Sequence, residues 1–250
     1  MSPRAPLLAA ALALLAAGTA AQVRTERDSE GKIVITNRGS RASKALAAPS
    51  TPLPKVSDQA RAEIRRKLKA ACDRKGLDYD LVTALVHAES GFQQYTLSRK
   101  GAVGLMQVLP ATARRFGVSD PWDLDQNIEA GTAFLAFLCS LFPDSPPLVL
   151  AAYNAGENAV AKYGGRIPPY AETVRYVFRI LEDYGRPKLV AQAKTLLATP
   201  ADYDRFYVPY RNVAPVTRVL YMHVDAKGVR SFTDYPPSGV TSTPIVFKDE

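Results

Sequence analysis

The sequence predicts a mainly α-helical protein in which one helical domain is flanked by short β-hairpins on its N-terminal and C-terminal sides. Helical hydrophobic patterns follow one another through residues 58–185, with Gly- and Pro-containing breaks between them. Beyond residue 200, prolines punctuate β-branched and aromatic residues, as in short strands. With 250 residues, 47% of them hydrophobic, the chain can bury a core of ordinary size.

The N-terminus has the pattern of a secretory signal peptide over residues 1–21. Arg4 precedes an apolar stretch at residues 5–17, and small residues follow at 18–21. An uncleaved membrane anchor is the alternative, but the apolar stretch is too short to span a bilayer. No later apolar run approaches the required length, so we expect an exported protein with no membrane span.

A Pro-rich linker is expected between the N-terminal hairpin and the helical domain. Residues 22–57 combine a polar piece with Pro49, Pro52 and Pro54 in a Ser-, Thr- and Ala-rich setting. Such a stretch cannot hold a helix or a central strand. The sequence therefore predicts a hairpin plus a linker over residues 22–57.

The helical domain is predicted over residues 58–185. Ser57 is suited to cap the first helix, and Gly76 is suited to end it. Further helical patterns cover residues 111–116, 126–142, 148–153, 157–163 and 170–184. After this domain, residues 186–250 are expected to form one more helix, at 188–198, and a strand-rich appendage.

Two ten-residue segments carry a weak internal repeat. Residues 28–37 and 225–234 place Asp, Gly and Thr at the same spacing, with a Gly-containing turn between extended flanks. This pattern predicts a β-hairpin in each segment. If the repeat is real, the two hairpins can pair or pack together around the helical domain; chance similarity is the alternative.

The two cysteines, Cys72 and Cys139, are candidates for one disulfide. Disulfides persist in the oxidising compartments that exported proteins reach, so we expect a bridge between them. Their apolar neighbours are equally compatible with a pair of buried free thiols, which is the alternative.

Glu89 is the candidate catalytic carboxyl. On a helix beginning near Asp80, the residues Leu81, Val82 and Leu85 occupy its side of the helix, so the carboxyl continues an apolar stripe. Desolvation disfavours the charged form of a carboxyl, which suits a group that must hold a proton near neutral pH. Position alone favours an ordinary surface or salt-bridged Glu, and the residues that follow change this interpretation.

Residues 89–112, ESGFQQYTLSRKGAVGLMQVLPAT, resemble the signature of the soluble lytic transglycosylase catalytic-domain family, which is lysozyme-like and acts on bacterial peptidoglycan. The matching positions are Glu89, Ser90, Phe92, Ser98, Gly101, Ala102, Gly104, Leu105, Met106, Gln107, Pro110 and Thr112. Residues 127–138, 152–160 and 165–177 resemble three later blocks of the family, in the same order. Gln93, Gln94 and Leu109 depart from the family pattern at the loop and the cleft wall.

The resemblance implies a lysozyme-like fold and a lytic transglycosylase reaction in the bacterial cell envelope, in the periplasm or outside the cell. Glu89 would protonate the β-1,4 bond that follows N-acetylmuramic acid. It would then act as base on the 6-hydroxyl of that sugar, which closes a 1,6-anhydro ring. The implied substrate-binding residues are Ser98, Gln107, Tyr153, Asn154, Glu172 and Tyr176. For Glu172 and Tyr176, a role in helix packing is the alternative. The implied partner is the glycan strand of peptidoglycan, and no cofactor is implied.

Two other functions remain open at this stage. A hydrolytic muramidase on the same fold would need a second carboxylate, for which Asp120, Asp123 and Asp125 are the candidates. A non-catalytic peptidoglycan-binding protein would only hold the glycan, and an intact Glu89 in a complete motif counts against it.

Other classes of site are disfavoured by the sequence. Two His and two Cys residues cannot form a metal-ligand cluster at the usual spacing. His87 should point away from Glu89 on the shared helix. The net charge of +8 favours an anionic polymer or surface. Export and the lack of a basic, aromatic-interleaved stretch disfavour nucleic acid.

Overall fold

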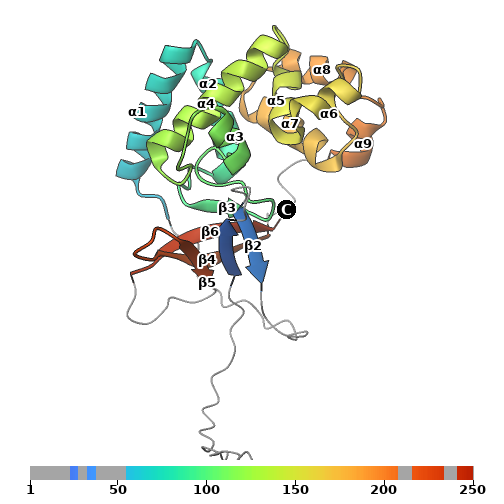
Figure 1. Ribbon diagram of the computed structural model, residues 1–250. Helices are drawn as coiled ribbons and strands as arrows, with labels where there is room; N and C mark the ends of the chain where they lie inside the picture. The colour runs from blue at the N-terminus through green and yellow to red at the C-terminus, as the bar shows by residue number, and fades with distance from the viewer. Residues whose placement is uncertain (1–22, 28–32, 38–54, 208–215, 234–240, 250) are drawn as a thin grey trace, which may run out of the picture.

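A computed structural model describes residues 23–27, 33–37, 55–207, 216–233 and 241–249 (Figure 1). The expected signal peptide and most of the expected Pro-rich linker lie outside the described residues. In Figure 1 the helices form one body, and the strands form a sheet against one side of it. No helix in the described ranges is both long enough and apolar enough to cross a membrane.

Among the described residues, the first eight helices begin near the predicted positions, whereas the ninth lies where the sequence predicted a strand-rich appendage. The helices are α1 (Asp58–Lys75), α2 (Tyr79–Ser90), α3 (Pro110–Arg115), α4 (Leu124–Leu141), α5 (Pro146–Ala155), α6 (Glu157–Lys162), α7 (Ala171–Asp183), α8 (Pro187–Thr195) and α9 (Asp202–Phe206). The Ser57 side chain accepts a hydrogen bond from the Ala60 amide, and Gly76 ends α1 with φ of 65°. Both predicted caps of the first helix are therefore confirmed.

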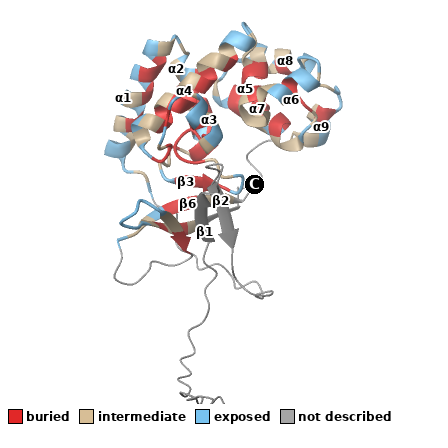
Figure 2. Ribbon diagram, in the orientation of Figure 1, coloured by how far each residue is buried: buried red, intermediate tan, exposed pale blue. Residues whose placement is uncertain are grey.

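The helical core continues past residue 185, where the sequence predicted the end of the domain. Ala193 on α8 and the following Leu197 are buried in the same core as α2, α5 and α7. Leu197 also forms a backbone bridge with Ile167. The helix predicted at 188–198 therefore belongs to the helical body. Figure 2 shows the buried residues gathered on the inner faces of these helices.

The sheet joins segments from both ends of the described chain to one strand of the helical body. Its strands are β1 (Val23–Arg27), β2 (Ile33–Asn37), β3 (Thr96–Ser98), β4 (Val216–Val224), β5 (Arg230–Thr233) and β6 (Thr243–Asp249). Within the described ranges the strand order is β2-β1-β5-β4-β6-β3. Neighbouring strands are antiparallel except β6 and β3, which are parallel.

Each predicted segment supplies only the second strand of an antiparallel pair, and the first strand, β1 or β4, precedes the predicted segment. In the C-terminal pair, Asp225 accepts hydrogen bonds from the amides of Lys227 and Val229, and Gly228 has φ of 77°. In the N-terminal one, β1 pairs with β2, while residues 28–32 lie outside the description. Strand β1 also pairs with β5, so the two hairpins lie side by side, as the repeat predicted.

The predicted disulfide is wrong: Cys72 and Cys139 are both free. Lys67 and Lys75 on α1 bind Asp125 and Glu129 near the start of α4. These contacts place Cys72 beside the first turns of α4, while Cys139 lies ten residues beyond Glu129. At 1.5 Å per residue that is about 15 Å along the helix, more than a disulfide spans.

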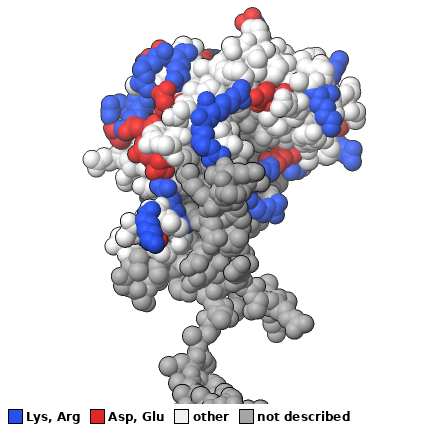
Figure 3. Space-filling model, in the orientation of Figure 1, with Lys and Arg blue, Asp and Glu red and all other residues white. Residues whose placement is uncertain are grey.

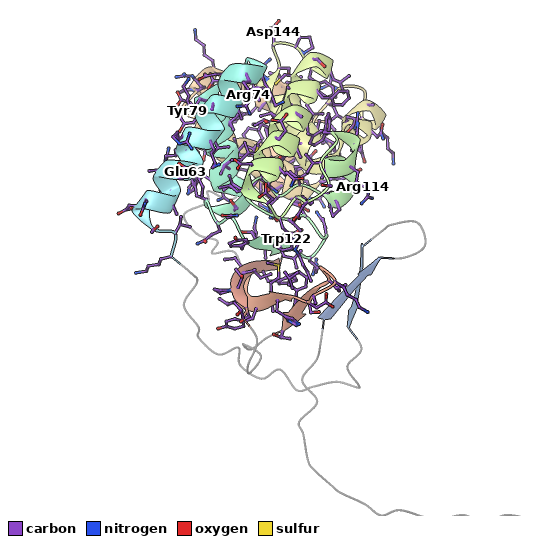
Figure 4. All side chains as sticks on the ribbon, turned by 60° about the vertical axis from the view of Figure 1, so that its left-hand side comes forward. Glu63, Arg74, Tyr79, Arg114, Trp122 and Asp144 are labelled. Atoms are coloured by element: carbon purple, nitrogen blue, oxygen red, sulfur yellow. The ribbon has the colours of Figure 1, made fainter. Side chains whose placement is uncertain are left out.

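A second, smaller core attaches the sheet to the helical body. Leu97 and Trp122 from the helical body pack with Phe232 and Ile245 from the sheet. The rings of Trp122 and Phe232 lie 5.7 Å apart, and Figure 4 shows Trp122 between the two parts. This contact fixes the sheet beside the loop that follows α2.

Candidate active site

Glu89 lies in the last turn of α2, and only 8% of its surface is exposed. Leu81, Val82 and Leu85 on the same helix are buried, so the predicted apolar stripe is confirmed. Gly91, with φ of 60°, ends the helix directly after this turn. The chain thus presents a largely buried carboxyl at the end of a helix.

Two tyrosines from other helices face this carboxyl. The hydroxyl of Tyr176 on α7 donates to Oε1 of Glu89 at 2.6 Å. The hydroxyl of Tyr153 on α5 donates to the carbonyl oxygen of Met106 at 2.8 Å. Burial, and after it the Glu89 carboxylate, raises the pKa of both phenols well above its ordinary value. Both tyrosines therefore stay protonated and act as hydrogen-bond donors.

The loop after α2 brings Ser98 and Gln107 to the site. Ser98 is buried on β3, and its hydroxyl oxygen accepts from the amide of Ala102. The Gln107 side-chain amide donates to the carbonyl oxygens of Thr96 at 3.2 Å and Gly104 at 2.9 Å. Its Oε1 is buried and has no partner among the described residues. A buried acceptor without a partner can take an N–H of a bound ligand.

Asn127 at the start of α4 holds this loop together. Its Nδ2 donates to the carbonyl oxygens of Val103 and Pro121, and its Oδ1 accepts from the amide of Met106. The side chain packs so close to Gly104 that a Cβ there would lie 2.2 Å from Nδ2. Asn127 opens the second matching block but was not among the predicted site residues.

Asn154 and Glu172 form a neighbouring polar network. The hydroxyl of Thr173 donates to Oδ1 of Asn154 at 2.7 Å, and Nδ2 of Asn154 donates to Glu172 at 3.3 Å. Lys100 from the loop binds both carboxylate oxygens of Glu172, at 2.6 and 2.8 Å. Lys100 was not predicted as part of the site.

The predicted site residues therefore come together on α2, β3, the loop, α5 and α7. Asn154 directly follows Tyr153, and Glu172 lies one helical turn before Tyr176 on α7, so the polar network adjoins the Glu89 cluster. His87 points elsewhere, with its Nδ1 3.0 Å from Oδ2 of Asp183.

The three aspartates of the muramidase alternative have structural partners. Asp120 binds Arg230 of β5, and Asp123 caps α4 through the amide of Gln126. Asp125 binds Lys67 of α1. Among the described residues, the buried carboxyls are Glu89 and Asp202, and Asp202 lies on α9.

Charges elsewhere on the helical body are mixed. Figure 3 shows basic and acidic side chains interspersed on the face in view. In the described part of the chain, no group of three or more His, Cys, Asp or Glu side chains is placed to hold a metal ion.

Comparison with known proteins places this site in a family. Residues 67–170 match the family model described as the transglycosylase SLT domain. This match includes Glu89, the loop, Tyr153 and Asn154, and ends shortly before Glu172 and Tyr176. Residues 67–170 therefore have the sequence of an SLT transglycosylase domain, and the resemblance seen in the sequence is confirmed.

Several curated relatives are lytic transglycosylases by name. A membrane-bound lytic murein transglycosylase F of Desulfosudis oleivorans is 34% identical over 131 residues, which cover 48% of this chain and 29% of the relative. A transglycosylase of Enterobacteria phage PRD1 is 39% identical over 101 residues, covering 40% and 37%. This chain therefore spans about a third or less of the length of the Desulfosudis oleivorans relative. The same holds for a membrane-bound lytic murein transglycosylase F of Maricaulis maris, of which about a third is covered.

A solved structure is also similar in sequence. An inactive mutant of lytic transglycosylase Slt from Pseudomonas aeruginosa is 30% identical, with 50% of this chain and 24% of that chain covered and a TM-score of 0.44.

Proposed function

We propose that this protein is a lytic transglycosylase that cleaves the β-1,4 bond between N-acetylmuramic acid and N-acetylglucosamine in peptidoglycan. The observation that carries the proposal is the Glu89 carboxyl, buried at the end of α2 and bound by Tyr176. Its position in an SLT domain and the names of the relatives support the same activity.

The chemistry begins with proton transfer from Glu89 to the oxygen of the scissile bond. As the bond to the anomeric carbon breaks, positive charge develops there, and most glycosidases stabilise it with a second carboxylate. The three candidate aspartates bind structural partners instead. We therefore assign this role to the acetamido group of the muramic sugar itself.

The second half of the reaction returns the proton to Glu89. The carboxylate takes the proton of the 6-hydroxyl of the muramic sugar, and the 6-oxygen forms a bond to the anomeric carbon as the acetamido oxygen releases that carbon. The 1,6-anhydro ring closes without consuming water. The hydrogen bond from Tyr176 stabilises the carboxylate that exists between the two steps.

The remaining polar groups are suited to hold the sugars. Gln107 offers a buried acceptor oxygen for the N–H of an acetamido group. We assign Ser98, Tyr153, Asn154 and Glu172 to orientation of this group and of the adjacent sugar.

We place this activity in the bacterial cell envelope, in the periplasm or outside the cell. The signal-peptide pattern at residues 1–21 supports export. Relatives named membrane-bound lytic murein transglycosylases support an envelope location. The net charge of +8 suits an anionic cell-wall polymer.

Replacement of Glu89 by Gln separates catalysis from binding. The amide keeps the shape of the side chain but has no proton to transfer, so clearing of insoluble peptidoglycan should slow by about 100-fold or more. Sedimentation with peptidoglycan should be unchanged. Glu63→Gln on the exposed side of α1 is the matched control and should clear at the wild-type rate (Figure 4). A folded Glu89→Gln protein that clears at the wild-type rate would support the non-catalytic binding protein instead.

A further inference from the structure

The C-terminal strand β6 is attached directly to the site loop. It pairs in parallel with β3, so that Lys248 stands opposite Ser98. The amide of Val246 donates to the carbonyl oxygen of Tyr95 at 2.8 Å. The strand that carries Ser98 is therefore held in place by residues about 150 positions further along the chain.

Lys248 also reaches the helix that carries Glu89. Its Nζ donates to the backbone carbonyl oxygen of Glu89 at 2.7 Å. Carbonyl groups in the last turn of a helix lack partners within the helix, and a cation there interacts favourably with the helix dipole. A bond from an ammonium group is stronger than one between neutral groups. Lys248 thus caps the end of α2 at the catalytic residue itself.

We propose that Lys248 is a positioning residue for Glu89 and that the C-terminal sheet is an integral part of the active site. The proposal rests on the proposed function, because it assigns Glu89 a catalytic role. Glu89 is held at both ends: Lys248 fixes its backbone carbonyl, and Tyr176 fixes its carboxyl. A displacement of about 1 Å at a reacting group can cost a large factor in rate.

The attachment of the sheet makes Lys248 a fixed support. Phe232 and Ile245 of the sheet are buried against Leu97 and Trp122 of the helical body. An ion pair of 2.7 Å between Arg230 and Asp120 adds a second attachment. Because β6 pairs with β3 on one side and with β4 on the other, the backbone that carries Lys248 is fixed on both sides. The SLT family match ends at residue 170, so this support lies beyond the matched region.

The test compares three full-length variants on a soluble peptidoglycan fragment. Lys248→Met removes the ammonium group and keeps the length of the side chain, whereas Lys248→Arg keeps a charged donor. Lys227→Met, in the exposed turn of the same sheet, is the matched control. We expect Lys248→Met to lower kcat by about tenfold with KM within about twofold, because binding is retained and orientation is lost. Lys248→Arg should recover most of the lost kcat, and Lys227→Met should behave as wild type.

Hydrogen exchange supplies a measurement that needs no turnover. Amides in the last turn of α2 should exchange faster in Lys248→Met than in wild type or Lys227→Met. An active wild type with unchanged kcat in Lys248→Met would overturn the positioning role and leave the proposed function standing. A rise in KM, or a loss of kcat that Lys248→Arg does not recover, would also overturn it. An inactive wild type with the exchange difference present would overturn the proposed function and leave the support of α2 by Lys248 standing.

Discussion

The hydroxyl of Tyr176 lies 2.6 Å from Oε1 of Glu89 and joins two helices whose contacting residues are 87 positions apart. Glu89 belongs to α2 and Tyr176 to α7, so the orientation of the carboxyl depends on how these helices pack. The matched SLT region ends at residue 170, one residue before α7 begins. The surroundings of Glu89 are therefore formed both by residues within the matched region and by residues after position 170.

Tyr176→Phe removes one hydrogen bond and keeps the ring. We expect kcat to fall by about tenfold, because the carboxylate formed after proton transfer loses a donor. The free energy of unfolding should change by only about 1 kcal/mol.

Tyr184→Phe is the control for this variant. Its hydroxyl makes a similar bond of 2.7 Å to Asp78, but outside the site. Equal kcat values in the two Phe variants would show that the bond to Glu89 has no part in turnover.

Asn127→Ala should loosen the site loop and destabilise the fold. The side chain satisfies two buried carbonyl groups and one buried amide. Removing it leaves these groups without partners, so we expect a loss of about 2–4 kcal/mol in the free energy of unfolding. Urea denaturation measures this loss. Asn158→Ala, on an exposed position of α6, should cost less than about 0.5 kcal/mol, and a similar loss in both variants would contradict the assignment.

The Cys72 thiol should lower the free energy of unfolding as the pH rises through the alkaline range. Burial raises the pKa of the Cys72 thiol from 9.0 to about 11. Between these values the unfolded protein has released this proton and the folded protein has not, so stability falls as the pH rises.

Urea denaturation at pH 8 and pH 10.5, with reductant present, measures this effect. The decline should be smaller in Cys72→Ala than in wild type.

Both cysteines should remain reduced, so alkylation of the unfolded, unreduced protein should modify both of them. An unmodified pair that reacts only after reduction would restore the disulfide rejected above.

Local patterns allowed much of this structure to be predicted from sequence. The caps Ser57 and Gly76 act within one turn of their helix. The burial of Glu89 follows from apolar residues one and two turns earlier on the same helix. The repeated Asp and Gly of residues 225–234 predicted the C-terminal turn, in which Asp225 accepts from the Val229 amide.

Contacts between distant segments explain what was missed. Lys248 reaches Glu89 across 159 positions, and Lys100 reaches Glu172 across 72. Nothing in the local sequence of either lysine indicates its partner. The disulfide prediction failed for the same reason, because the alignment of α1 along α4 results from packing between distant segments, which spacing in the sequence does not reveal.

Mass analysis of the products from peptidoglycan, digested in water enriched in heavy oxygen, tests the central claim most directly. If the 6-hydroxyl closes the ring, each released fragment should end in a 1,6-anhydro muramic sugar, one water lighter than the hydrolytic product and without heavy oxygen. Asp120→Asn, Asp123→Asn and Asp125→Asn should give the same products, because these side chains bind Arg230, the α4 amide and Lys67. Reducing ends that carry heavy oxygen, with turnover lost in one of these Asn variants, would contradict the account and identify a muramidase.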